Sequence, residues 1–192
     1  MNLKYVTGSD RHGWLDVRID GIPQIASLSY ALKVDLLGAA NGREQFKVLE
    51  GYRRQKIGNV LLPSRGGSQL GNVVHRGPAR VRYSISAGMV TFGAQFATAI
   101  TSPRNPAPLG TWGLQIPDEK HTRFGTTYLP RTPHATTWFR LGDGSDRYLH
   151  CGVATDGCVT VTDFSKWSRI WEYLVLARSG DNINVGTIAV VR

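Results

Sequence analysis

Residues 29–50, SYALKVDLLGAANGREQFKVLE, contain two runs in which apolar and polar residues alternate, and Asn41-Gly42 lies between them. Alternation with a period of two is typical of a β-strand with one buried and one solvated face. Asn and Gly adopt positive φ at little cost, so this pair favours a tight hairpin turn. The stretch therefore predicts two strands, 29–37 and 44–50, joined as an antiparallel hairpin.

Further strands are expected on both sides of this hairpin. The 22 glycines and nine prolines follow no period, which favours many tight turns over a helical bundle. The alternating or β-branched runs are WLDVRID (14–20), RVRYSIS (80–86), TTWFRLG (136–142) and VGTIAVV (185–191). We expect a mainly β fold.

One segment has helical periodicity. Asp163 is a good N-cap residue, and spacings of three and four then place six apolar side chains on one face. They are Phe164, Trp167, Ile170, Trp171, Leu174 and Val175. This pattern predicts a helix near the C-terminus that packs on the sheet.

Two segments rich in Gly and Pro, 63–78 and 101–113, are expected to be irregular. The 192 residues suffice for one domain, or one domain with an added lobe. The first of these segments divides a basic β-rich part, 1–78, from 79–192. The first part is either a separate lobe or an extension of the same domain.

The net charge of +9 is uneven. Residues 1–100 carry 13 Lys and Arg against six Asp and Glu, a net of +7. A basic surface raises encounter rates with polyanions, but no nucleic-acid motif is present, and we expect Arg53-Arg54-Gln55-Lys56 to be a solvated strand or turn face. No apolar run approaches the roughly 20 residues of a membrane span. The first 20 residues also lack an apolar signal core, so we expect synthesis in the cytoplasm without the general secretory route.

The two cysteines, Cys151 and Cys158, allow three interpretations. Cys158 follows Gly157 at a turn and precedes the apolar run 159–161, a rigid mount for a nucleophile whose base would be His150. A buried, unreactive cysteine is the ordinary alternative. A disulfide between the two is the third.

Five segments, in order, resemble the L,D-transpeptidase catalytic domain, often called the YkuD domain. They are SISAG (84–88), NPAPLGTWGLQIP (105–117), FRLGDGSDRYLHCG (139–152), the TDGC of 155–158 and NVGTIAVV (184–191). The resemblance covers 79–192. It implies a β-sandwich whose cysteine attacks the bond between L- and D-centres in peptidoglycan stem peptides, commonly after meso-diaminopimelate. Water or an amine then resolves the acyl-enzyme.

Carried over by position, the resemblance makes Cys158 the nucleophile and His150 the general base. Gly157 and Cys158 would supply the oxyanion amides, Thr155 would brace the turn, and the Cys151 carbonyl would orient the imidazole. His134 is the fallback base.

Other side chains are candidates for substrate binding by their chemistry. Trp112, Trp138 and Tyr128 are candidates to wall a groove, with burial in the core as the alternative. Arg140 and Arg147 are candidates to hold a substrate carboxylate, with a solvated surface position as the alternative. Asp156 is expected to polarise His150 or to recognise an amine. His12, His75 and His121 have no metal-ligand spacing, so no metal and no cofactor are predicted.

The pattern departs from the family in three ways. The His–Cys spacing is eight residues and is shorter than usual, Asp156 stands where the family has histidine, and Thr160 stands where the family often has arginine or asparagine. This compact form resembles type VI secretion effectors of the same fold. The resemblance implies an antibacterial toxin, a delivering secretion apparatus, the periplasm of a target cell and an immunity protein. The competing interpretation is a catalytically silent module of the same fold that binds cell wall or another polyanion.

Overall fold

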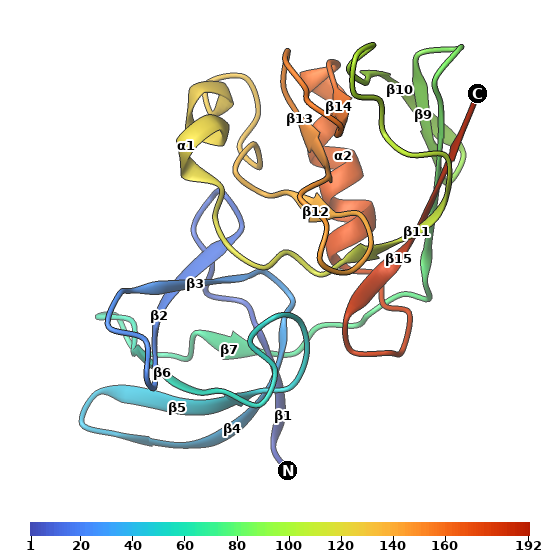
Figure 1. The fold of residues 1–192 in the computed structure, drawn as a ribbon. Coiled ribbons are helices and arrows are strands. Elements are labelled where there is room, and N and C mark those ends of the chain that lie inside the picture. Colours follow the sequence, from blue (N-terminus) through green and yellow to red (C-terminus); the bar gives the residue numbers. More distant parts are fainter.

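The computed structural model describes residues 1–192 and is mainly β, with its strands in two sheets (Figure 1). The first sheet has seven strands in the order β3-β2-β6-β5-β4-β1-β7. Their bounds are β1 (Leu3–Val6), β2 (Trp14–Ile19), β3 (Ala26–Ser29), β4 (Lys33–Ala40), β5 (Arg43–Val48), β6 (Ile57–Leu61) and β7 (Leu70–Gly71).

The predicted Asn-Gly hairpin is confirmed. β4 and β5 are antiparallel neighbours, and the turn between them holds Asn41 and Gly42 at φ 53° and 70°. The predicted strand 29–37 is instead divided, because β3 ends at Ser29 and β4 begins at Lys33. Ala31, at φ 63°, turns the chain there. Ala31 and Leu32 are buried, so a turn inside the core produced the same apolar spacing as a strand.

The second sheet has eight strands in the order β11-β15-β8-β9-β10-β14-β13-β12. The arrangement is sandwich-like. The two ends of the strand order also meet, because an isolated bridge pairs Leu114 of β11 with Leu141, directly after β12. Two of its neighbour pairs, β13 with β14 and β15 with β8, are parallel. The bounds are β8 (Ala79–Ser84), β9 (Met89–Phe92), β10 (Gln95–Ile100), β11 (Gly110–Gln115), β12 (Phe139–Arg140), β13 (Tyr148–Cys151), β14 (Val159–Val161) and β15 (Asn184–Val191).

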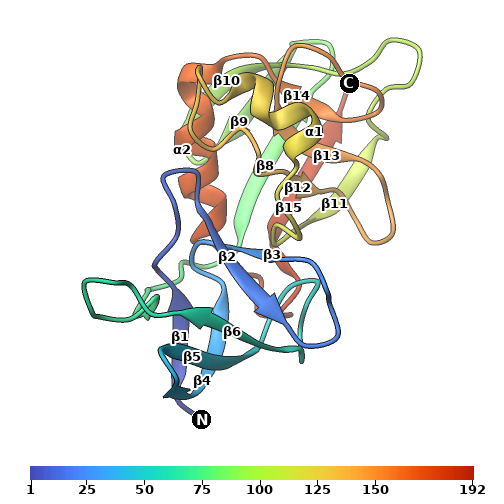
Figure 2. The same cartoon turned by 90° about the vertical axis from the view of Figure 1, so that its left-hand side faces the viewer.

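The predicted C-terminal helix is α2 (Phe164–Val175), beside the second sheet (Figure 2). The side chain of Asp163 caps it by accepting a hydrogen bond from the Ser165 N–H. Five of the six predicted apolar residues are buried, and the sixth, Trp171, is half-buried and stacks on His134. The expectation of a mainly β fold with one amphipathic helix near the C-terminus is confirmed.

Between β11 and β12, the chain forms a short α1 (Thr122–Gly125) and a 3-10 turn at Thr126–Tyr128, neither of which we predicted. The predicted strand 136–142 shortens to Phe139–Arg140, and β11 begins inside the segment 101–113 that we expected to be irregular. Neither helix has the length and apolar character needed to span a bilayer.

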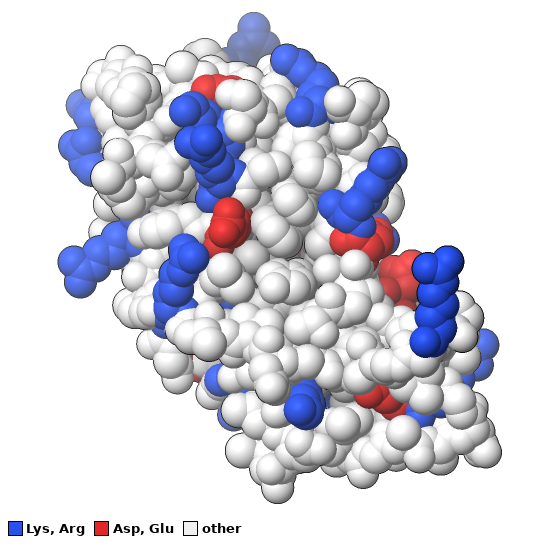
Figure 3. Space-filling model, turned by 180° about the vertical axis from the view of Figure 1, so that it is seen from behind, with Lys and Arg blue, Asp and Glu red and all other residues white.

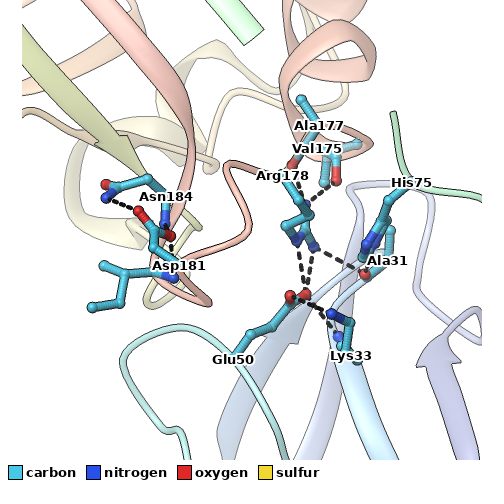
Figure 4. A network of polar contacts seen from close by, with 10 residues as sticks. Ala31, Lys33, Glu50, His75, Val175, Ala177, Arg178, Asp181 and Asn184 are labelled. Atoms are coloured by element: carbon cyan, nitrogen blue, oxygen red, sulfur yellow. Dashed lines mark hydrogen bonds and ion pairs between the residues drawn. The ribbon is translucent and has the colours of Figure 1, made fainter. Parts of the chain in front are cut away.

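A buried ion pair joins the two sheets (Figure 4). Arg178, which follows α2, donates from Nε and Nη2 to Glu50 Oε1 at 2.8 and 2.7 Å. Its Nη2 also donates to the Ala31 carbonyl at 3.0 Å, and its Nη1 to the Val175 carbonyl at 2.9 Å. Because Glu50 is only 1% exposed, the pair fixes the end of β5 against the chain that leaves α2.

Basic side chains are spread over the molecular surface rather than gathered in one patch on the face that Figure 3 shows. Arg54, Gln55 and Lys56 are exposed in a turn after β5. Arg53 is the exception in this cluster, since its Nη1 donates to the Asp118 carbonyl at 2.6 Å.

Candidate active site

The parallel pairing of β13 with β14 brings the chain segments that carry His150 and Cys158 side by side. His150 is opposite Thr160, and Cys158 directly precedes β14. Paired residues share a face, so His150 and Thr160 lie on the same side, and Cys158 lies two residues before Thr160, in the bend that leads into β14. Residues 152–158 return the chain to start the second strand. Strands this short need a return of only about 10–13 Å, which seven extended residues span easily.

Cys151 points to the opposite face and is part of the hydrophobic core. It pairs with Val161, three residues past Cys158, which is about 10 Å along the strand. A disulfide needs Cα atoms within about 7 Å. Both cysteines are free, and their placement is incompatible with a bridge between them.

The ring of His150 is bonded at both nitrogens. Nδ1 lies 3.0 Å from the Cys151 carbonyl, which only accepts hydrogen bonds, so we assign the ring proton to Nδ1. Nε2 then accepts from the Thr160 hydroxyl at 3.0 Å. Burial lowers the pKa of His150 to about 4, so the ring is neutral at pH 7 and the lone pair of Nε2 is unprotonated.

Cys158 is 7% exposed, and its Sγ accepts a hydrogen bond from the Tyr148 N–H at 3.4 Å. Burial raises the pKa of this thiol, outweighing the effects of that N–H and of Arg147. At neutral pH the thiol of Cys158 is therefore protonated and the imidazole of His150 is neutral, and Nε2 of His150 is bonded to Thr160 rather than to Cys158.

The turn before the cysteine is built around Gly157, at φ 81°. Thr155 Oγ1 donates to the Cys158 carbonyl at 3.0 Å, the brace expected from the sequence. No protein acceptor takes a hydrogen bond from the N–H groups of Gly157 and Cys158. Two free N–H groups on consecutive residues at a sharp turn are suited to stabilise an oxyanion.

Arg147 holds this turn in place. Its Nη1 donates to the carbonyls of Pro106 and Gly157, both at 3.1 Å, and its Nη2 donates to Asn105 Oδ1 at 3.0 Å. Asn105 in turn donates to Asp156 Oδ1 at 2.8 Å. These protein contacts occupy much of the Arg147 guanidinium, whereas the side chain of Asp156 is exposed to solvent.

A column of stacked rings covers His150. Trp138 stacks on His150 with centroids 4.3 Å apart and planes at 23°. His121 stacks on the other face of Trp138 at 4.3 Å and 7°. Tyr148 meets His121 and Trp138 edge-on. Sequence reasoning missed His121, because it lies in an irregular segment 29 residues before His150 and no local pattern marks it.

The carboxylate of Asp118 contacts both His121, a member of this column, and Arg140. Arg140 Nη2 contacts Asp118 Oδ2 at 2.7 Å, and His121 Nε2 lies 3.5 Å from Oδ1. Although burial alone raises it, contacts with His121 and Arg140 hold the pKa of Asp118 at about 2. We regard Arg140 as the stronger of these two partners, since 3.5 Å is long for a hydrogen bond. Arg140 also donates to the Ser145 carbonyl at 2.9 Å.

The remaining candidates make no hydrogen bond to Cys158 or His150. Trp112, on β11, donates from Nε1 to the Pro108 carbonyl at 3.0 Å. His134 packs against α2, stacking on Trp171 at 3.6 Å with Nδ1 3.2 Å from Ser168 Oγ, so none of its contacts supports it as the base. Tyr128 packs against Phe164 at 5.2 Å.

Comparisons with known proteins give only distant likenesses. No family model matches the chain, and no curated protein matches it. Among solved structures, it is similar to L,D-transpeptidase 1 of Mycobacterium tuberculosis, with 14% identity over 83% of this chain and 98% of that one, at a TM-score of 0.42. A second similar structure is an L,D-transpeptidase from M. tuberculosis H37Rv, with 12% identity, 92% of each chain covered and a TM-score of 0.38.

Proposed function

We propose that this protein is a cysteine-dependent L,D-transpeptidase or L,D-carboxypeptidase that acts on peptidoglycan stem peptides. The observation that supports the proposal is the parallel strand pair, which brings the segments of His150 and Cys158 side by side, while the Cys151 carbonyl leaves Nε2 of His150 as the nitrogen available to act as base. The ordered family-like segments of 79–192 supply the substrate class.

In the proposed reaction, His150 Nε2 takes the proton of Cys158 Sγ, and the thiolate attacks the scissile carbonyl carbon. The resulting oxyanion accepts hydrogen bonds from the N–H groups of Gly157 and Cys158. The imidazolium then gives its proton to the departing amine, which leaves a thioester. Water or a second amine, deprotonated by His150, attacks the thioester and releases the thiol.

This reaction requires Nε2 of His150 to exchange one hydrogen-bond partner for another. Nε2 must leave the Thr160 hydroxyl and meet the thiol of Cys158, two residues before Thr160 in the chain. In the proposed mechanism, the arrangement seen here precedes substrate binding, and the exchange accompanies it.

Charged groups around the thiol divide into two roles. Exposed Asp156 is suited to bind the amine of a stem peptide. Arg140 and Arg147 instead hold the protein, the first through Asp118 and the second through the turn at Gly157. Direct contact of either arginine with a substrate carboxylate stays a prediction, as does contact with Trp112.

Turnover of purified muropeptides, followed by mass spectrometry, tests the proposal. The wild type should yield cleaved or amine-exchanged stem peptides and a covalent acyl adduct on Cys158. Cys158→Ala should abolish turnover and adduct, whereas Cys151→Ala, which removes the thiol of the opposite face, should retain both. Full activity of Cys158→Ala would refute the mechanism.

The proposed biological setting is an antibacterial effector, delivered into the periplasm of a rival cell by a dedicated secretion apparatus and countered by an immunity protein. Its support is the resemblance of the compact His–Cys spacing. Expression in the periplasm of a sensitive bacterium should lyse the cells, and Cys158→Ala should not. Equal growth with both forms would contradict the effector role.

A catalytically silent cell-wall-binding module is the second candidate. It is favoured by the burial of His150 and Cys158 at 6% and 7% exposure, with neither bonded to the other. Co-sedimentation with purified sacculi separates the two functions. A binder sediments with them unchanged after Cys158→Ala and never forms the acyl adduct.

A further inference from the structure

The indole of Trp138 determines where the His150 ring can lie. It stacks on that ring at 4.3 Å and donates from Nε1 to the Ala135 carbonyl at 3.2 Å. The second face of the indole is covered by His121 at 4.3 Å. A displacement of His121 would therefore free Trp138 to move, and with it the surface that confines the proposed base.

His121 is the last residue of a short segment, 117–121, whose contacts determine where its ring lies. Its N–H donates to the Thr136 carbonyl at 3.0 Å, and its Nε2 faces the carboxylate of Asp118. Asp118 is bonded at its other oxygen to Arg140. This segment contains no helix or strand of its own, so its position depends on side-chain contacts together with the backbone hydrogen bonds of His121 to Thr136 and Gly125.

Residues in or next to the strands of the first sheet contact segment 117–121 at Asp118 and at Lys120. Arg53, in the turn after β5, donates to the Asp118 carbonyl at 2.6 Å. Lys120 Nζ lies 3.6 Å from Asp10 Oδ2 and 3.5 Å from Asp16 Oδ1, the latter on β2. Asp118 itself and Lys120, the residue before His121, are thus fixed by groups from residues 1–78.

We propose that the first sheet positions the general base of the second, through segment 117–121 and the stacked rings of His121 and Trp138. Arg53 and Lys120 are positioning residues in this proposal, because neither touches Cys158 or His150. The predicted effect on turnover rests on the proposed function. The predicted effect on the position of the His150 ring does not rest on it, and it can be measured without a substrate.

The test uses the full chain with Arg53→Met and Lys120→Met, singly and together, with Arg54→Met and Lys56→Met as controls from the same exposed turn. The first readout is the NMR signal of His150 Hε1, which stacking on Trp138 moves upfield by the ring current. We expect the double variant to shift this signal toward its unstacked position. The controls should leave it in place.

The second readout is turnover of muropeptides. The double variant should lower kcat several-fold with little change in KM, since it disturbs the base and not a substrate contact. Because Lys120 and its two partners are partly exposed, high salt should weaken their pairing. The wild type in 1 M salt should therefore approach the single Lys120→Met variant. Arg53→Lys, which keeps a donor, should restore most of the loss.

An unchanged His150 signal in a folded double variant would overturn the positioning role, whatever the kinetics. A shifted signal in a protein that never turns over muropeptides would support the positioning role and refute the proposed function. A shifted signal with unchanged kcat would also overturn the inference, since it would show that the placement of the ring does not control the chemistry.

Discussion

His150 Nε2 and Thr160 Oγ1 form a 3.0 Å hydrogen bond across the parallel pair β13–β14. The side chain two residues beyond the proposed nucleophile thus occupies the lone pair that the proposed mechanism needs. Thr160 is fully buried, so water does not compete for this bond in the resting state.

Thr160→Val should raise the reactivity of Cys158. Valine keeps the shape and removes the hydroxyl, so Nε2 loses its partner and can pair with the thiol. We expect alkylation of Cys158 by iodoacetamide, followed by peptide mass mapping, to become several-fold faster. The unfolding free energy should fall by about 1–3 kcal/mol, since a buried acceptor is left unpaired. Thr160→Ser keeps the hydroxyl and should react like the wild type; equal rates for both variants would contradict the hydroxyl's role.

Stability should fall as the pH drops from 6.5 toward 4. The pKa of His150 is near 4 in the folded protein and near 6.5 when unfolded, so the unfolded chain binds the extra proton in this window. The stabilising difference is full above pH 6.5, lost progressively below it, and amounts to about 3 kcal/mol. Urea unfolding at pH 7.0 and 4.5 measures this loss.

His134 contributes in the same direction, because burial lowers its pKa to about 4 as well. His134→Gln and His150→Gln should each flatten part of the pH dependence. Asp118, with a pKa near 2, loses its contribution only below about pH 3.8 and does not act in this window. A profile that stays flat from pH 7.0 to 4.5 in the wild type would contradict the buried neutral state of both rings.

Breaking the buried pair between Glu50 and Arg178 should destabilise the whole molecule. Arg178→Met leaves the Glu50 carboxylate buried without its partner, which typically costs about 3–5 kcal/mol. Lys33→Met is the matched control, because Lys33 Nζ lies 3.9 Å from the same carboxylate but is 27% exposed. We expect that control to change the unfolding free energy by less than about 1 kcal/mol. Comparable losses for the two variants would show that burial does not govern this network.

Gly157→Ala should damage the proposed oxyanion site more than its backbone strain alone explains. A Cβ at this position would lie 2.1 Å from Arg147 Nη1, so the turn must move. Gly144→Ala is the control for strain, because Gly144 has φ 65° and nothing within 4 Å of such a Cβ. Each change should cost about 1–2 kcal/mol for the left-handed backbone. Only Gly157→Ala should also lower kcat by about 10²-fold or more; an equal kcat for both variants would exclude these amides.

The sequence was most informative where the determining interactions are local. The Asn41-Gly42 turn, the Asp163 cap and the apolar face of α2 all depend on neighbours a few residues apart, and all were predicted. The turn at Ala31 was not, because its left-handed φ accompanies contacts with His75 and Arg178, far along the chain.

The same division holds at the candidate site. The brace from Thr155 and the carbonyl contact of Cys151 join residues within three positions of each other, and both were expected from the family resemblance. His121 and Asp118 reach the site only because the chain from β11 to β12 folds back over β13. The first sheet's hold on that segment joins residues 65 and 104 positions apart, a relationship that no spacing in the sequence reveals.

The closure of the second sheet decides which part of the molecule exposes unpaired strand edges. Because Leu141 pairs with Leu114, β12 does not end the sheet at an open border. The first sheet has two such borders, the four-residue β3 and the two-residue β7. Open edges are where chains add strands to one another and begin to aggregate. Self-association on partial unfolding should therefore begin in residues 1–78 and leave the strands that carry Cys158 intact the longest.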